Sequence, residues 1–222
     1  MGKIENYGKL KKFVLNEGMA LFGVADIEQV KNDFQLPAEI AAKHTAGISL
    51  GFRLSGSVLE TLSNAPNQIY YFHYQRTNLL LDHAALKLTA LIQSKGYSAL
   101  PVPASQVIHW EKQLGTVNHR EIARLAGLGW YGRSNLLVTP DYGSQVRLAT
   151  VLTDMPLKFD SPLKAGCGSC EACVAACPSG AISRDNFNLQ LCREKLKDFM
   201  KTEKIGQMIC GLCVRACKGK KQ

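Results

Sequence analysis

All eight cysteines of the 222-residue chain lie between positions 167 and 217, and this grouping constrains the fold more than any other feature. Four of them follow the run Cys-x2-Cys-x2-Cys-x3-Cys-Pro, which begins at Cys167 and ends at Pro178. Three more follow Cys-x2-Cys-x3-Cys, from Cys210 to Cys217, and Cys192 stands between the two runs. The first run is the bacterial ferredoxin pattern for a cubic iron–sulfur cluster, in which the fourth cysteine ligates the other cluster of a pair. The spacing therefore predicts two [4Fe–4S] clusters.

The eight thiols divide into two ligand sets without a remainder. The first three cysteines of the first run can bind one cube, and the last cysteine of the second run completes it. The fourth cysteine of the first run crosses to the other cube. The second run lacks the first cysteine of the ferredoxin pattern, so a thiol from further upstream must replace it. The predicted ligands of the first cluster are Cys167, Cys170, Cys173 and Cys217, and those of the second are Cys177, Cys192, Cys210 and Cys213.

Zinc and disulfides are the alternative uses of so many cysteines. Structural zinc sites usually combine two separated Cys-x2-Cys pairs, whereas this chain has a triple run followed by proline. Disulfides need an oxidising compartment, and residues 1–6, MGKIEN, contain no apolar core of a secretory signal. Iron–sulfur clusters are therefore favoured over zinc and disulfides, and we expect a cytoplasmic location.

Length and composition allow one ordinary domain and a small appendage. With 46% hydrophobic residues the chain can bury a proper core, and no stretch approaches the roughly 20 apolar residues of a membrane span. We expect an α/β core over residues 1–160 and a small ferredoxin-like domain with the two clusters over residues 161–222. The formal charge of +9 falls to roughly +5 once each cluster with its four thiolates contributes about −2.

The lysine surplus is concentrated around the cysteines. The lysines in question are Lys195, Lys197, Lys201, Lys204, Lys218, Lys220 and Lys221. A basic surface can attract nucleic acid, but no RNA-binding motif accompanies it here. We expect these lysines instead to compensate the negative charge of the clusters and to form a docking face for an acidic, low-potential electron donor such as a ferredoxin or flavodoxin.

Alternating helix and strand patterns over the first 160 residues predict the α/β class. Apolar positions at helical spacing predict a helix over residues 4–17 and a long helix from about 78 to 94. Short apolar and aromatic runs predict the strands between them. These strands are expected at residues 20–27, 48–54, 68–74 and 98–104.

Two further elements are predicted ahead of the cysteines. Asn118 is the expected cap of a helix, because Glu121 three residues on makes a capping box, and this helix should end at Gly127. Segments 134–139 and 145–153 should then pair as a hairpin across a PDYG turn.

A glycine-rich turn, AGLGWYGR over residues 126–133, lies between this helix and the hairpin. Glycine lets the backbone approach another group closely. Together with the PDYG turn, the LTD sequence at 152–154 and the cysteine set, this segment resembles the epoxyqueuosine reductases and, more distantly, the reductive dehalogenases. The resemblance is dense from about residue 118 to 217 and looser before it.

The resemblance implies a nitroreductase-like α+β core that holds a cobalamin and a ferredoxin-like tail that delivers single electrons to the cobalt. It also implies that the glycine-rich turn contacts the cobalamin. The contacts implied in this way are Gly127, Leu128, Gly129, Trp130, Gly132 and Arg133.

Two departures from the family bear on the substrate. The reductases carry a Val-Asp-Ser-Ala-Pro segment shortly before the AGLGW run, whose aspartate is their proposed proton donor, whereas residues 113–118 read QLGTVN here. They also extend beyond the clusters into helical repeats that help to bind transfer RNA, whereas this chain stops at Gln222. We therefore expect a short relative whose substrate is a small molecule, or whose partner is a corrinoid protein, rather than tRNA.

Reduction of a substrate also needs a proton donor, and two side chains are taken as catalytic. His119 lies on the first turn of the helix that leads into the glycine-rich turn, although an exposed first-turn histidine without a role is the alternative. Tyr74 is the second, although strand tyrosines are commonly core residues. His73, His109 and Glu111 are further candidates.

Three functions remain open on the sequence. The favoured one is a cobalamin-dependent iron–sulfur reductase of a small molecule, since the segment that resembles the family brackets its cobalamin pocket. The second is an electron-transfer protein that reduces or reactivates a corrinoid protein. The third is a tRNA-modifying enzyme like the epoxyqueuosine reductases.

Overall fold

The computed structural model describes residues 2–109 and 114–219. The chain forms two compact units, each assembled from three segments. The first unit comprises Met1–Phe52, Asn78–Leu128 and Arg147–Leu163, and the second comprises Arg53–Thr77, Gly129–Val146 and Lys164–Gln222. The predicted domain boundary at residue 160 lies beside the last of these division points. The two earlier segments of the second unit have no counterpart in that prediction.

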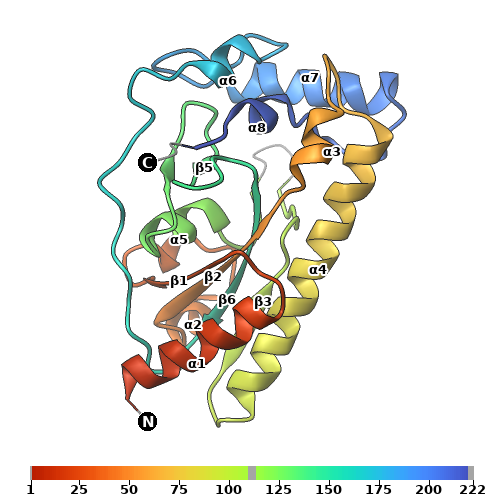
Figure 1. The fold of residues 1–222 in the computed structure, drawn as a ribbon. Helices are drawn as coiled ribbons and strands as arrows, with labels where there is room; N and C mark the ends of the chain where they lie inside the picture. The colour runs from red at the N-terminus through yellow and green to blue at the C-terminus, as the bar shows by residue number, and fades with distance from the viewer. Residues whose placement is uncertain (1, 110–113, 220–222) are drawn as a thin grey trace. The chain divides into compact units, whose positions relative to one another are not determined.

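The first unit is built on a four-stranded sheet in the order β1-β2-β6-β3 (Figure 1). Its strands are β1 (Leu21–Asp26), β2 (Ala46–Arg53), β3 (Ala99–Val102) and β6 (Val146–Thr153). β1 pairs antiparallel with β2, and β3 pairs antiparallel with β6. An antiparallel arrangement of strands that helices separate in the sequence makes this core α+β, as the resemblance implies, and corrects the α/β class predicted from the alternating pattern.

Helices cover both faces of this sheet. α1 (Lys3–Asn16) and the second part of α4 (Gln68–Gln93) share one apolar core with the sheet, and α5 (His119–Leu125) shares the other (Figure 1). Successive side chains of β1 point to opposite faces of the sheet. Val24 therefore packs in the first core and Ala25 in the second. Two shorter helices, η1 (Lys31–Asp33) and α2 (Ala38–Ala42), complete the unit.

The second unit is made of short elements. They are α3 (Gly56–Glu60), residues 68–77 of α4, β4 (Trp130–Tyr131), β5 (Leu137–Val138), α6 (Ala172–Ala175), α7 (Leu189–Thr202) and α8 (Leu212–Ala216). α8 contacts both α3 and α6. The apolar core of the unit consists of Leu54, Leu59, Leu62, Tyr70, Tyr74, Ile205, Ile209 and Leu212.

Several predicted elements are confirmed with small shifts of their ends. The first helix and the strands expected at 20–27, 48–54 and 98–104 appear as α1, β1, β2 and β3. α5 begins after Asn118, whose side-chain oxygen accepts a hydrogen bond from the backbone amide of Glu121, as an N-cap should.

The strand predicted at residues 68–74 is wrong, because these residues form the first turns of α4. Their aromatic side chains favour a strand by propensity, but tertiary packing selects the helix. Tyr70 and Tyr74 lie one turn apart and are both buried in the core of the second unit. The side-chain oxygen of Asn67 accepts a 2.9 Å hydrogen bond from the amide of Tyr70 and so caps the helix.

The predicted hairpin between residues 134–139 and 145–153 is also wrong. β5 pairs with β4 instead, while β6 joins the four-stranded sheet. The PDYG turn itself does form, closed by a bridge between Thr139 and Gly143. Sequence patterns identify a turn from local residues, whereas the partner of a strand depends on distant ones.

Among the described residues, no helix is both long and apolar enough to cross a bilayer.

Candidate functional site

All eight cysteines belong to the second unit, and all eight are free thiols. Cys173 lies on α6, Cys192 on α7 and Cys213 on α8. Their exposure differs widely, because Cys173 is buried whereas Cys170 is exposed. The short helices and the loops between them therefore hold the thiols at different depths.

The thiols of the predicted first cluster influence one another electrostatically. The pKa of Cys173 is raised, mainly by burial and further by the charges of Cys217, Cys167 and Cys170. Charge interactions weaken with distance, so the other three sulfurs lie near that of Cys173. The fold thus brings Cys217 to the Cys167–Cys173 loop despite their separation in sequence.

The other four thiols form a second group. Burial raises the pKa of Cys210 to about 11, and the charges of Cys192 and Cys177 add to this effect. Burial also raises the pKa of Cys213 above its usual range, and its charged neighbours include Cys173 of the first group. The two groups therefore adjoin each other, and their members are those of the two ligand sets assigned from the sequence. Ligation itself stays a prediction.

Backbone amides surround the sulfur of Cys177. Burial acts to raise its pKa, but hydrogen bonds from the hydroxyl and amide of Ser179 and from the amides of Ile182 and Ala181 lower it overall. The Ser179 hydroxyl lies 3.6 Å from the sulfur. Hydrogen bonds to a thiolate favour its charged form, which is the form that binds metal.

The described residues offer no site for a single metal ion. Across residues 2–109 and 114–219, no three side chains of His, Cys, Asp or Glu lie close enough to hold one metal ion. Tetrahedral zinc would bring its cysteine sulfurs within about 3.8 Å of one another, since each Zn–S bond measures about 2.3 Å. An iron–sulfur cube spreads its four ligands further apart, because its own atoms lie between them.

The glycine-rich turn approaches this region within the second unit. A methyl group on Gly129 would lie 2.2 Å from the carbonyl oxygen of Val138, so β4 and β5 could not pair as they do. One on Gly132 would lie 2.5 Å from Cγ2 of Val138 and 3.6 Å from Sγ of Cys167. The turn therefore needs glycine for its own packing, and this packing places it beside a predicted cluster ligand.

The other predicted cobalamin contacts of this turn differ in their surroundings. Gly127 and Leu128 belong to the first unit, where a methyl group on Gly127 would lie 2.6 Å from the carbonyl oxygen of Ser161. Trp130 is buried in the second unit, and its Nε1 has no hydrogen-bond partner among the described residues. A buried donor left unsatisfied costs about 1–3 kcal/mol, so an acceptor on a bound molecule would stabilise this site.

Arg133 is engaged by the cysteine loop. Its Nε donates to the carbonyl oxygen of Cys170 at 3.0 Å, and one terminal nitrogen donates to that of Gly168 at 2.6 Å. The other terminal nitrogen donates to the carbonyl oxygen of Arg184. The guanidinium therefore binds protein backbone, and a contact with cobalamin stays a prediction.

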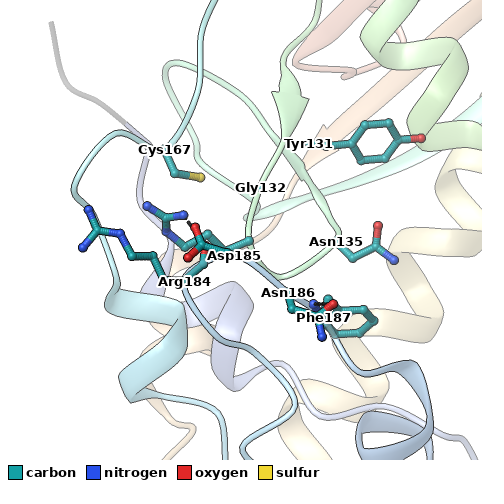
Figure 2. A pocket seen from close by; sticks show the side chains of 9 residues that line it. Tyr131, Gly132, Asn135, Cys167, Arg184, Asp185, Asn186 and Phe187 are labelled. Atoms are coloured by element: carbon teal, nitrogen blue, oxygen red, sulfur yellow. Dashed lines mark hydrogen bonds between the residues drawn. The ribbon is translucent and has the colours of Figure 1, made fainter.

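An open pocket of about 490 Å³ lies next to Arg133 in the second unit. Figure 2 shows the sulfur of Cys167 at one side of this pocket and the side chains of Tyr131 and Asn135 at the other. Its volume falls in the range of small-molecule sites. The complete lining is Tyr131, Gly132, Arg133, Asn135, Cys167, Arg184, Asp185, Asn186 and Phe187.

The PDYG turn packs against the C-terminal end of the cysteine segment, around Cys217. Gly143 has φ +57°, and a methyl group on it would lie 2.2 Å from the carbonyl oxygen of Cys217 and 2.4 Å from the amide nitrogen of Gly219. The turn and the chain around Cys217 therefore pack backbone against backbone. The sequence predicted the turn but did not indicate that it packs against the chain around Cys217.

His119 lies in the first unit with both ring nitrogens engaged. Nδ1 lies 2.8 Å from Oγ1 of Thr150, and Nε2 lies 3.0 Å from the carbonyl oxygen of Pro103. A carbonyl only accepts, so Nε2 carries the hydrogen. Burial lowers the pKa of His119 to about 4; the Pro103 hydrogen bond opposes this, and the charge of Arg147 adds to it. The ring is neutral at pH 7, and its role as a proton donor stays a prediction.

The remaining proton-donor candidates are dispersed. Tyr74 is buried in the core of the second unit, its ring centroid 6.4 Å from that of Tyr70. His73 accepts a 3.1 Å hydrogen bond from the amide of Ser55, and burial lowers its pKa. His109 contacts a glutamine side chain of the first unit. Glu111 lies outside the described residues.

Comparison with known proteins places these features in a family context. No family profile matches the chain. An epoxyqueuosine reductase of Listeria monocytogenes is 36% identical over 113 residues, which are 46% of this chain and 30% of that protein. About half of the chain is thus similar in sequence to an epoxyqueuosine reductase. The predicted resemblance is thereby confirmed, although the chain covers less than a third of this curated relative.

Solved structures share the fold at lower identity. A reductive dehalogenase, described with a mechanism for B12-dependent dehalogenation, superposes with a TM-score of 0.79 at 20% identity. The match covers 97% of this chain and 32% of the dehalogenase. The epoxyqueuosine reductase from Bacillus subtilis superposes with a TM-score of 0.67 at 20% identity, over 98% of this chain and 67% of that protein. At this identity the likeness concerns the fold alone.

Proposed function

We propose that this protein is an iron–sulfur oxidoreductase that passes single electrons through two [4Fe–4S] clusters to a cobalamin, which reduces a small-molecule substrate. The observation that carries the proposal is the division of eight free thiols into two adjoining groups of four within one compact unit. Two cubes need this number of ligands in this arrangement.

The thiols and their surroundings suit the clusters. Cys167, Cys170, Cys173 and Cys217 would hold the first cluster, and Cys177, Cys192, Cys210 and Cys213 the second. When bound, the clusters supply one-electron transfer at a potential set by burial and by hydrogen bonds to sulfur. The residues after Cys177 provide such hydrogen bonds, and Ile209 and Leu212 supply an apolar shell around the second group.

Two observations support a cobalamin beside the glycine-rich turn. The buried indole Nε1 of Trp130 lacks an acceptor among the described residues. The pocket that Tyr131, Gly132 and Asn135 line borders the sulfur of Cys167, so a molecule bound there would adjoin the first cluster. Cobalamin would supply the metal centre that reduces the substrate, as the description of the related dehalogenase indicates for that protein.

The electron-transfer alternative also has support. His119, one of the two candidate proton donors, is kept neutral by burial, and both of its ring nitrogens contact protein groups. Cys170 is exposed, so an electron could reach or leave the first cluster directly at the surface. Under this alternative the protein would reduce a corrinoid partner instead of a substrate.

The deciding experiment is an anaerobic cobalt-to-iron measurement. The clusters are rebuilt, excess cobalamin is added, the unbound fraction is removed, and the Co(II) EPR spectrum is recorded. We expect about one cobalt per eight irons. Eight irons without cobalt would favour the electron-transfer alternative, and fewer than eight irons in the rebuilt protein would contradict the two-cluster proposal.

Trp130→Phe provides a matched variant for the same experiment. It keeps an aromatic ring in the buried site but replaces the indole with a smaller ring, so the N–H is lost together with some packing. We expect full iron content with several-fold weaker cobalamin retention, because a hydrogen bond contributes about 1 kcal/mol. Unchanged cobalamin retention would show that the indole does not contact the cofactor.

The third function, tRNA modification, is tested by measuring tRNA binding to the protein at increasing salt concentration. Any basic protein binds tRNA in a salt-sensitive way, so only binding that persists at 200 mM salt would support this function.

A further inference from the structure

The guanidinium of Arg133 connects three separate segments of the second unit. It belongs to the turn between β4 and β5, and it donates to carbonyl oxygens in two other places. Gly168 and Cys170 lie within the predicted ligand loop of the first cluster, and Arg184 lies on the segment that borders the pocket. A single side chain thus fixes the ligand loop against its surroundings.

The chemistry of this contact requires an arginine. Arginine presents five donors in a rigid planar fork, whereas lysine has a flexible stem and a compact ammonium group. Three carbonyl oxygens in different directions can be satisfied together by the fork. A lysine at this position would keep the charge but could not hold all three.

The contact also orients the peptide groups of the ligand loop. In a trans peptide unit the carbonyl and the N–H point in opposite directions. The carbonyls of Gly168 and Cys170 point to Arg133. The amides of the same peptide units, those of Ser169 and Glu171, are therefore directed away from the guanidinium.

We propose that Arg133 is a positioning residue of the first iron–sulfur cluster, which fixes the Cys167–Cys170 loop and raises the reduction potential of that cluster. The inference rests on the proposed function, because it requires the cluster. A permanent positive charge beside the loop stabilises the reduced cluster, which carries one more negative charge than the oxidised one. Amides held in one orientation add to this effect when they face sulfur.

The test is an EPR-monitored redox titration of the rebuilt protein, with the iron content measured in parallel. Arg133→Met removes both the charge and the fork, whereas Arg133→Lys keeps the charge. In Arg133→Met the first cluster should become about tenfold harder to reduce, which is about 59 mV for one electron. The second cluster should keep its potential, and Arg133→Lys should recover more than half of the shift.

Arg184→Met is the matched control. Arg184 lines the same pocket, but its side chain is 65% exposed and forms a 3.5 Å surface ion pair with Glu171, and only its backbone carbonyl contacts Arg133. Solvent screens the charge of such a side chain. The first-cluster potential of Arg184→Met should therefore move by less than half of the shift in Arg133→Met. An equal shift would attribute the effect to net charge and would overturn the proposal.

Other outcomes are also decisive. Wild-type protein with eight irons and an unchanged first-cluster potential in Arg133→Met would overturn the positioning role and leave the proposed function intact. Wild-type protein without two clusters would overturn the proposed function itself. If Arg133→Met assembles no cluster, the iron content of Arg133→Lys tests the positioning role instead. Eight irons in that variant support the role, and loss of both clusters there would contradict a role confined to the first.

Discussion

Cys177 and Cys213 are predicted ligands of the same cluster, but their surroundings shift the pKa of the two thiols in opposite directions. Amides and a hydroxyl around Cys177 lower its pKa, so the thiolate forms readily. Burial of Cys213 raises its pKa above the usual range. Since ligands bind metal as thiolates, the surroundings of Cys177 favour the iron-binding form of its sulfur, whereas the burial of Cys213 disfavours that form.

Cys192→Ser tests the ligand assignment at the scale of one residue. Cys192 is the one thiol placed in its set by elimination, and in the structure its charge acts on Cys210 and Cys213. We expect iron to fall from about eight to about four atoms per chain, with loss of the second-cluster EPR signal alone. Cys170→Ser, in the other set, should remove the first-cluster signal instead. If Cys192→Ser loses neither signal, the eight-ligand scheme is wrong.

At the scale of elements, the short β4–β5 pair and the turn after it support the cysteine segment from one side. Gly132 brings this pair to Cys167, Arg133 holds the loop that follows, and Gly143 packs on the chain around Cys217. Three of the predicted first-cluster ligands thus depend on residues 129–146. A glycine-rich turn in this place would therefore support the proposed first cluster through packing, whether or not it also contacts a second cofactor.

Gly143→Ala tests this support. The added methyl group would occupy a left-handed backbone position and overlap the backbone at Cys217 and Gly219. We expect loss of about four irons per chain, because Cys217 would be displaced, and a loss of several kcal/mol in unfolding free energy, measured by urea denaturation. Gly96→Ala is the control, since Gly96 has φ +83° and open space around it. It should cost only about 1–2 kcal/mol and retain all iron.

At the scale of the whole molecule, the two units differ in what stabilises them. The larger core of the first unit contains eighteen buried residues, whereas that of the second contains eight. Small cores rarely suffice alone, and such units commonly depend on a bound metal. Iron binding and folding of the second unit should therefore be coupled.

Removal of iron by a chelator tests this coupling by hydrogen exchange. We expect amides of α7 and α8 to lose protection by at least tenfold, while those of α1, β1 and β2 in the first unit keep theirs. The iron-loaded protein carried through the same exchange without chelator is the control. Equal loss of protection in both units would contradict the difference between them, and no loss in either would show that the second unit folds without metal.

Local signals in the sequence predicted the elements that depend on local chemistry. The cap at Asn118, the apolar run of β1 and the PDYG turn were all recognisable, because each is determined by residues within a few positions. The first turns of α4 were not, since aromatic propensity pointed to a strand and only burial of Tyr70 and Tyr74 decides for the helix. Among the site residues, the cysteines were predicted from spacing alone, whereas no neighbouring residue in the sequence indicated that Arg133 contacts the cysteine loop.

The sequence by itself determined the chemistry of this protein: eight thiols at ferredoxin spacing and a glycine-rich turn that resembles one family of reductases. Only the tertiary structure decided which segments stand beside those thiols. It brings Cys217 to the Cys167–Cys173 loop, Arg133 to the carbonyls of that loop, and Gly143 to the chain around Cys217. The reason is physical, because ligand type and turn chemistry are properties of neighbouring residues, whereas contacts between distant segments follow from how the cores pack.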